Sequence, residues 1–288
     1  MQASLPVTLG PVQETLLIPL LGRARETEKK RGILGDPKAL EIVDSLAFDF
    51  SKWEGTRSLV GTCVRTCMFD TYVRDFLKRY PDGTVVELGC GLNTRFERLD
   101  NGLARWIEVD LPDVIELRRL FFEEGPRRTL IAASALDTSW MDVAEETRAP
   151  VMVVAEAILI YLDAPQARQA LEAIAARFPG SWIAFDTTSS RRVDAQARHD
   201  AKRHLPSETW FRWRFGDPSE IEAWGVGLRL AESRTFLDAE PSLVAAFPWA
   251  FRLLVRCAPW WLRRRIGDYR LNLVIADAFD SAKPEGKP

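Results

Sequence analysis

The chain has few histidines and cysteines, and this scarcity excludes several kinds of site. Of its 288 residues, two are histidine and four are cysteine. The cysteines are irregularly spaced, which predicts reduced thiols rather than a disulfide framework, and two histidines are too few to complete a typical metal site. Cys63 and Cys67 lie four residues apart on one face of an expected helix, where packing explains them better than metal binding. We therefore expect no metal.

Long apolar runs and an excess of charge are also missing. No stretch reaches the roughly 20 apolar residues that cross a membrane, and the first residues lack a secretory signal pattern. Lys and Arg number 39 against 41 Asp and Glu, which leaves a formal net charge of −2. This balance argues against a nucleic acid or an anionic membrane as partner. We expect a soluble, cytoplasmic protein, and the sequence leaves its oligomeric state open.

Short apolar runs that alternate with helical stretches are the main pattern in the chain. With 47% hydrophobic residues it can bury one large core, and the alternation is typical of an α/β fold with a mainly parallel sheet covered by helices. We expect strands at 84–89, 105–110, 129–133, 151–156, 181–186, 227–236 and 269–279. Helices are expected at 38–50, 57–79, 112–124, 164–177 and 217–225.

The regions outside this alternation divide the chain further. Residues 1–80 are expected to form a helical segment that packs on the same domain as a lid, and residues 81–280 to form the core, with helical insertions at 190–225 and 241–266. The second insertion is rich in tryptophan and arginine, as a membrane-surface helix would be. Pro248 and Pro259 interrupt it, which favours two helices packed on the sheet. The last residues are expected to fray.

Acidic residues stand at or near the ends of four expected strands: Glu87, Asp110, Glu156 and Asp186. Ligands of such sheets bind beyond the carboxyl ends of the strands, so these side chains are candidates for ligand contacts. For Asp186, which precedes the sequence TTSS, helix capping is an equally good explanation.

The glycine-containing loop after the first of these strands, in TVVELGCGLNTRF (84–96), limits the ligand. No lysine stands where a triphosphate loop needs one, and Thr94 occupies the place of the third glycine of a dinucleotide loop. Glu87 would repel a pyrophosphate but attract an ammonium group, and Asp110 lies where an acid accepts hydrogen bonds from both ribose hydroxyls. These features favour S-adenosylmethionine (SAM), although a dinucleotide fold or an ordinary tight turn also produces such a loop.

Several segments together resemble the leucine carboxyl methyltransferase family of SAM-dependent O-methyltransferases. The resemblance is to its bacterial branch, which includes polyketide carboxyl methyltransferases of the tetracenomycin type. It implies a class I, Rossmann-like fold with a mostly parallel seven-stranded sheet, helices on both faces and an N-terminal helical lid. The matching segments, in family order, are ETLLIPLLGRARE (14–26), LGDPKALEIV (34–43), VRTCMFD (64–70), VVELGCGLNTRFERLDNG (85–102), WIEVDLPDVIELRR (106–119), IAASALDTSW (131–140), AEAILIYL (155–162) and FPGSWIAFDTTS (178–189).

The resemblance also implies a cofactor site for SAM, with S-adenosylhomocysteine (SAH) as product. Arg65 matches the residue that pairs with the SAM carboxylate, a task suited to a guanidinium group. Ser134 and Ala135 stand where the family often has Asp-Leu against the adenine, so this contact is less secure. Together with Glu87, the expected cofactor residues are Arg65, Gly89, Gly91, Asp110, Leu111, Ser134, Ala135 and Glu156; Glu156 and Tyr161 are expected at the methyl-transfer site. Two alternatives stay open: Arg65 could pair with Asp70 on its own helix, and Tyr161 could belong to the core.

The type of acceptor follows from the scarcity of bases. A carboxylate is ionised at neutral pH, whereas a phenol, with a pKa near 10, profits from a base. His199 and His204 lie in a charged stretch outside the matching segments, where a solvated surface explains them. We therefore expect methylation of the carboxylate of a small organic or polyketide-type acid. A phenolic hydroxyl or a protein C-terminal carboxylate is the alternative acceptor, and a SAM-binding protein without activity is the alternative class.

Two further features could contact that acceptor. Arg23 and Arg25, in the expected lid, could receive its anion, although an exposed face explains them equally well. The aromatic segment TWFRWRFG (209–216) could wall an apolar or aromatic acceptor with Trp210, Phe211, Trp213 and Phe215, and core packing is the competing explanation.

Overall fold

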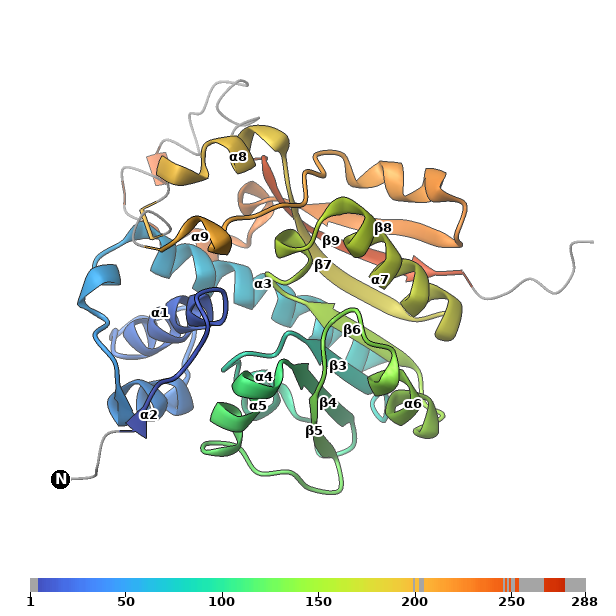
Figure 1. Cartoon of the computed structure of the whole chain (residues 1–288), viewed down its shortest axis with the longest axis horizontal. Helices are drawn as coiled ribbons and strands as arrows, with labels where there is room; N and C mark the ends of the chain where they lie inside the picture. Colours follow the sequence, from blue (N-terminus) through green and yellow to red (C-terminus); the bar gives the residue numbers. More distant parts are fainter. Residues whose placement is uncertain are drawn as a thin grey trace, which may run out of the picture.

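A seven-stranded sheet forms the centre of the described part of the chain (Figure 1). The computed structural model describes residues 5–198, 200–201, 205–245, 247, 249, 252–253 and 267–277. The sheet contains Thr84–Leu88 (β3), Arg105–Asp110 (β4), Arg128–Ala132 (β5), Val151–Ala155 (β6), Trp182–Thr188 (β7), Leu228–Arg234 (β8) and Tyr269–Ala276 (β9). All seven expected strands are therefore confirmed.

The order of the strands is β5-β4-β3-β6-β7-β9-β8. Strands β5, β4, β3, β6 and β7 are paired in parallel, and β9 runs antiparallel to both β7 and β8. The order reverses direction at β3, where the chain goes first outward to β4 and β5 and then back to β6. In open sheets of this kind, a ligand site lies beyond the carboxyl ends of the strands at such a reversal.

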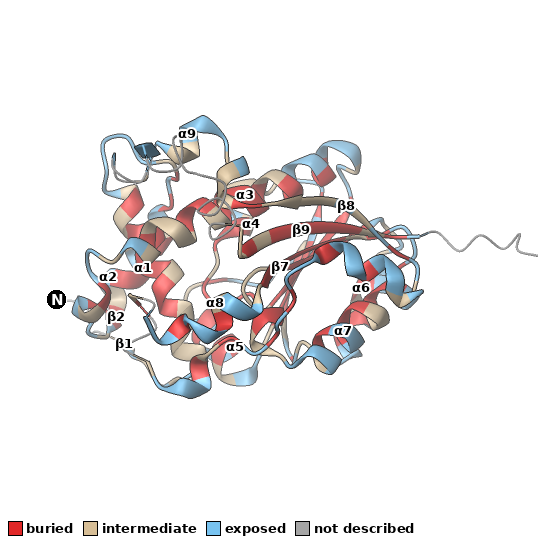
Figure 2. Ribbon diagram, turned by 90° about the horizontal axis from the view of Figure 1, so that it is seen from above, coloured by how far each residue is buried: buried red, intermediate tan, exposed pale blue. Residues whose placement is uncertain are grey.

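The central strands are buried on both faces, as parallel strands usually are. Every residue of β3 and β6 is buried. Because successive side chains of a strand point to opposite faces, Val86 and Val153 belong to one hydrophobic cluster and Val85 and Met152 to another. Figure 2 shows the helices buried where they face the sheet and exposed on the outside.

Helices cover both faces of the sheet. Arg57–Arg79 (α3) packs in one cluster through residues such as Phe76, while Ser139–Glu146 (α6) and Ala164–Arg177 (α7) pack in the other. Helix α7 begins at a capping box in which Asp163 accepts from the Gln166 amide. The shorter Arg95–Leu99 (α4) and Pro112–Arg119 (α5) follow β3 and β4. The expected helices 57–79 and 164–177 are confirmed, whereas 112–124 ends earlier, at Arg119.

The N-terminal residues form a separate helical layer beside α3 (Figure 1). It consists of the 3₁₀ helix Gln13–Leu16 (η1), Leu17–Thr27 (α1), Pro37–Ser45 (α2), the 3₁₀ helix Ser51–Trp53 (η2) and the two paired strands Leu5–Pro6 (β1) and Leu46–Ala47 (β2). Its own core includes Leu20, Ile42 and Trp53 and reaches Leu92 in the glycine loop. The expected helix 38–50 stops at Ser45 because the chain then extends to pair with β1.

The region between β7 and β9 contains several short helices. They are Ser190–Asp194 (α8), Pro241–Val244 (α9) and the 3₁₀ helices Gln196–Arg198 (η4), Ser207–Thr209 (η6), Pro218–Trp224 (η7) and Phe236–Asp238 (η8). The expected helix at 217–225 is thus a 3₁₀ helix. His199, His204, Cys257 and the C-terminal tail lie outside the described residues, as does most of the predicted insertion 241–266. No helix in the described ranges is long and apolar enough to span a membrane.

Candidate functional site

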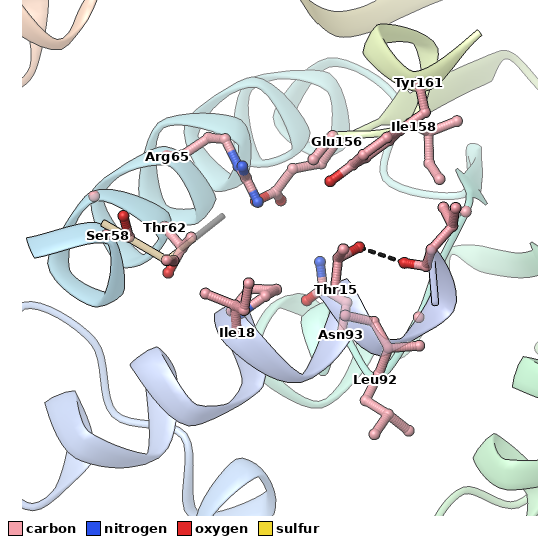
Figure 3. Close-up of a pocket in the computed structure, with 18 of the residues that line it drawn as sticks. Thr15, Ile18, Ser58, Thr62, Arg65, Leu92, Asn93, Glu156, Ile158 and Tyr161 are labelled. Carbon is pink, nitrogen blue, oxygen red and sulfur yellow. Dashed lines mark hydrogen bonds and ion pairs between the residues drawn. The ribbon is translucent and has the colours of Figure 1, made fainter. Parts of the chain in front are cut away.

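A cavity of about 500 Å³ lies beyond the carboxyl ends of β3, β4 and β6. Its walls come from the glycine loop, from η1 and α1, from the first half of α3 and from the segment after β6 (Figure 3). Such a volume is typical of a pocket for a small molecule or cofactor. The cavity therefore occupies the place that the strand order predicts for a ligand.

The glycine loop closes one side of this cavity in a conformation that depends on its glycines. Gly89 has φ 71°, and a Cβ atom there would lie 1.9 Å from Cγ1 of Ile158. Gly91 has φ 49° and donates its amide to Asp110 at 2.7 Å. The other carboxylate oxygen of Asp110 accepts from the Leu111 amide at 2.8 Å. Burial raises the pKa of Asp110, and the two amides oppose this rise.

Arg65 and Glu156 form an ion pair at the wall of the cavity. They point toward one another from α3 and from the end of β6 (Figure 3), with 2.8 Å between Arg65 Nε and Glu156 Oε1. The Thr66 hydroxyl donates to the same oxygen at 2.9 Å, and Arg65 Nη1 donates to the Tyr269 hydroxyl at 3.4 Å. Burial works to raise the pKa of Glu156, but Arg65 and Arg95 outweigh it and lower the pKa to about 2. Glu156 is therefore ionised at neutral pH.

Arg95, which the sequence analysis missed, connects this pair to the interior. Its side chain is fully buried and donates to Asp70 at 2.7 Å, to both oxygens of Glu87 and to Glu156 at 2.5 Å. Asp70 also pairs with Arg98 at 2.9 Å. The alternative pairing of Arg65 with Asp70 is therefore not what the structure shows.

This cluster changes the interpretation of Glu87. The carboxylate is buried against Arg95 and does not line the cavity. Its prediction as a direct contact for the SAM ammonium is corrected, because its oxygens face the guanidinium. Glu87 instead holds Arg95, which in turn holds Glu156.

Sequence and structural relatives identify the chain. The leucine carboxyl methyltransferase family matches residues 17–175. The tetracenomycin polyketide synthesis O-methyltransferase TcmP of Streptomyces glaucescens is 32% identical over 244 residues, which cover 84% of this chain and 89% of TcmP. The chain belongs to the leucine carboxyl methyltransferase family. This confirms the predicted family.

One further sequence relative supports the activity, and one solved structure supports the fold. The SAM-dependent methyltransferase dpfgK of Gibberella zeae is 31% identical over 284 residues, covering 91% of this chain and 94% of that protein. The plantazolicin methyltransferase BpumL, solved with a monoazolic desmethylPZN analog and SAH, shares the fold with a TM-score of 0.50 at 12% identity over 93% of this chain and 100% of BpumL. The protein is a SAM-dependent methyltransferase with a class I fold, as predicted, and SAM is its cofactor.

The other predicted residues of the methyltransferase differ in their placement. Leu111 and Tyr161 line the cavity with Gly89, Gly91 and Asp110, whereas Ser134 and Ala135, on the loop after β5, do not. Burial raises the pKa of the Tyr161 phenol, which keeps it protonated, and its ring packs edge-on against Phe211 at 5.4 Å between centroids. Tyr161 is thus both packed and exposed to the cavity.

The predicted aromatic wall is mostly core. Trp213 is 2% exposed and stacks on Phe215 at 4.9 Å, and neither Trp210 nor Trp213 lines the cavity. Phe211 is the residue of this segment that lines it. The prediction of Trp210 and Trp213 as acceptor contacts is corrected accordingly.

The predicted anion receptors already have partners. Arg23 borders the cavity, but it is buried, pairs with Asp36 at 2.8 Å and donates to the Leu92 carbonyl at 2.6 Å. It therefore attaches α1 to the glycine loop. Arg25 pairs at the surface with Glu54 at 2.7 Å. Neither guanidinium is available for an acceptor in this structure.

Asp186 stabilises the turn after β6. It is fully buried and accepts from the Ala157 amide at 3.0 Å and from the Tyr269 hydroxyl. Ala157 has φ 57°, a conformation that this hydrogen bond helps to hold. Helix α8 is capped by Ser189 instead. Of the two explanations left open for Asp186, the structure shows neither a helix cap nor a residue that lines the cavity.

Proposed function

We propose that this methyltransferase transfers the methyl group of SAM to the carboxylate of a small organic acid with an apolar or aromatic body, forming a methyl ester. The part of the cavity lined by Arg65, Gly89, Gly91, Asp110 and Glu156, which we call the cofactor half, supports the binding of SAM. Arg65 and Glu156 offer opposite charges to the carboxylate and ammonium of its amino acid part. Asp110 is the acid for the ribose hydroxyls, and Leu111 with Val114 offers an apolar contact to the adenine that Ser134 and Ala135 do not.

SAM, when bound, supplies a methyl group that is already activated by the sulfonium. The acceptor oxygen forms a bond to the methyl carbon while the carbon–sulfur bond breaks and its electron pair returns to sulfur, so that no proton has to move. The protein must mainly align the acceptor and exclude water, and alignment alone can contribute on the order of 7 to 11 kcal/mol to the lowering of the barrier. We assign the exclusion of water to η1 and α1, which cover the cavity as a lid.

The observation that carries the choice of a carboxylate is the chemistry of the described lining. It contains no histidine and no lysine. Glu156, with a pKa of about 2, is far too weak a base for a phenol with a pKa near 10. Burial raises the pKa of Tyr161 and of Tyr269, so both phenols stay protonated. An acceptor that arrives ionised needs no base from these residues.

Transfer of a labelled methyl group tests this function. The purified enzyme is incubated with labelled SAM and a panel of aromatic acids, polyketide-type acids, phenols of matched shape and a peptide with a free C-terminal carboxylate. We expect label in the small acids, and we expect mild alkali to release it, because methyl esters hydrolyse and phenyl ethers do not. Label that resists alkali, or that enters only phenols, would contradict the carboxylate proposal. Label in the peptide alone would move it to a protein acceptor.

A further inference from the structure

Arg192 presents to the cavity a guanidinium that has no hydrogen-bond or carboxylate partner among the described residues. It stands on α8, directly after β7, and lines the cavity beside Tyr269, whose ring centroid lies 5.2 Å from Arg192 Cζ. Within the described residues its side chain makes no hydrogen bond and no ion pair, and its Nε is buried without an acceptor. The side chain as a whole is half-buried, so its terminal nitrogens can reach a ligand in the cavity while its Nε stays buried without an acceptor. A buried donor without an acceptor is costly, and an anion bound in the cavity would offset that cost.

A comparison with nearby arginines shows that the position of Arg192, rather than its residue type, leaves its guanidinium without a carboxylate partner. Arg65 pairs with Glu156 and Arg23 pairs with Asp36, both at 2.8 Å, although both also border the cavity. Arg191, the preceding residue, turns outward and pairs with Asp268 at 2.6 Å. Within the described lining, the other arginine without a carboxylate partner is Arg57, which is exposed at the start of α3.

The surroundings of Arg192 fit an acid with an apolar body. Phe211, Phe236 and Tyr161 line the same cavity and can cover a ring system, while Arg192 receives the charged end. The described carboxylates that act electrostatically on it are Asp268 and Asp200. Asp268 is engaged by Arg191, and Asp200 accepts from the Arg57 amide at 2.8 Å. Burial lowers the pKa of Arg192, with Arg65 acting in the same direction and Tyr269, Asp268 and Asp200 opposing it.

We propose that Arg192 binds the carboxylate of the acceptor acid and thereby selects acids over neutral or phenolic molecules of the same shape. This inference rests on the proposed function and adds the residue that determines the acceptor class. A guanidinium that holds one carboxylate oxygen leaves the second free to face the methyl group. Arg65 remains with the cofactor, so the two anions in the cavity have separate arginines.

Calorimetry on the complex with SAH tests this assignment. 2-Naphthoate is the acid probe, and 2-naphthamide is its neutral match. We expect the wild type to prefer the acid, and Arg192→Met to weaken acid binding at least about tenfold, the usual scale for a lost hydrogen bond between charged groups, with amide binding unchanged. Arg192→Lys should recover part of the loss. The matched control Arg191→Met removes the same charge one residue away and should leave acid binding within twofold of the wild type.

The affinity for SAH distinguishes a role of Arg192 in binding the acceptor from a role in binding the cofactor. It should stay within twofold in Arg192→Met, and a cooperative melting transition shows that the variant is folded; if it is not, Arg192→Lys is compared with Arg191→Lys instead. A loss of SAH affinity in a folded variant, equal binding of acid and amide by the wild type, or unchanged acid binding without Arg192 would overturn the assignment. Methylation of acids with an unchanged KM in Arg192→Met would overturn it and leave the proposed function intact. Methylation of phenols alone would contradict the proposed function itself.

Discussion

The two halves of the cavity treat charge in opposite ways. Behind the cofactor half, Arg95 is fully buried and bonded to Asp70, Glu87 and Glu156. In the part of the cavity near Phe211 and Phe236, which we assign to the acceptor and call the acceptor half, Arg192 has no described carboxylate or hydrogen-bond partner. The charges behind the cofactor half are thus compensated within the protein before any ligand binds. Under the proposed function, the guanidinium of the acceptor half is compensated by the carboxylate of the acceptor.

The largest expected effect on stability comes from removing Arg95 from the buried ion-pair cluster behind the cofactor half. Arg95→Met would leave three buried carboxylates without their shared partner, and removal of one partner from a buried ion pair typically costs about 3–5 kcal/mol. We expect the free energy of unfolding, measured by urea denaturation, to fall by about this amount. Arg119→Met is the control, because Arg119 is half exposed and lies 3.7 Å from Glu124; its effect should stay within about 0.5 kcal/mol. Equal stabilities of the two variants would show that the cluster is not structural.

The sequence predicted the fold better than it predicted these charge partners. Strands and the long helices follow from local patterns, such as the short apolar run of β3 and the capping box of α7. Helix α5 is shorter than predicted because the chain turns back through Gly125 into β5, with Glu124 accepting from the Leu130 amide. These details depend on contacts that no local pattern contains.

Arg95 and Arg192 were missed for different reasons. Arg95 stands in the glycine-loop segment itself, but its partners Asp70 and Glu156 are 25 and 61 residues away in the chain. The run of acids at strand ends was a signal that a buried cation would be needed among them. Arg192 stands out in the structure because it has no carboxylate partner, which the sequence does not show. Arg191 beside it has the same side chain. Only the fold distinguishes which of the two faces the cavity.

Arg65 and Asp110 should contribute to the binding of different parts of the cofactor. Arg65→Met should weaken SAH binding by about 1.5 to 3 kcal/mol, the scale of a lost hydrogen bond to a charged group, but should not change the binding of 5′-methylthioadenosine, which has no amino acid part. Asp110→Ala should weaken both ligands, because both contain the ribose. Calorimetric titration of each variant with each ligand provides the four values. Equal losses for both ligands in Arg65→Met would place Arg65 elsewhere than at the amino acid part.

The last prediction is a gradual pH dependence of stability at Asp186, which lies near both halves of the cavity. Burial raises the pKa of its carboxyl from 3.8 to about 6, with Arg65 and the Tyr269 hydroxyl opposing the rise. A folded-state pKa above the unfolded value means that the folded protein binds more protons between pH 4 and 6. The stability that Asp186 contributes is therefore fully present below about pH 4 and is lost as the pH rises through about 6.

Asp186→Asn should remove this dependence and keep an oxygen for the Ala157 amide. We expect the free energy of unfolding of the wild type, relative to Asp186→Asn, to decrease between pH 4 and 6 with a slope of at most about 1.4 kcal/mol per pH unit, the limit for one proton. Glu156 acts in the opposite direction, since its folded pKa of about 2 lies below its ordinary value of 4.5, but it is common to both proteins and cancels in the difference. Urea denaturation at four pH values measures the slope. If the stability of the wild type relative to Asp186→Asn instead increases with pH, Arg65 and Tyr269 hold Asp186 ionised. The charges that are compensated within the protein would then include those beside the Tyr269 ring, against which Arg192 lies.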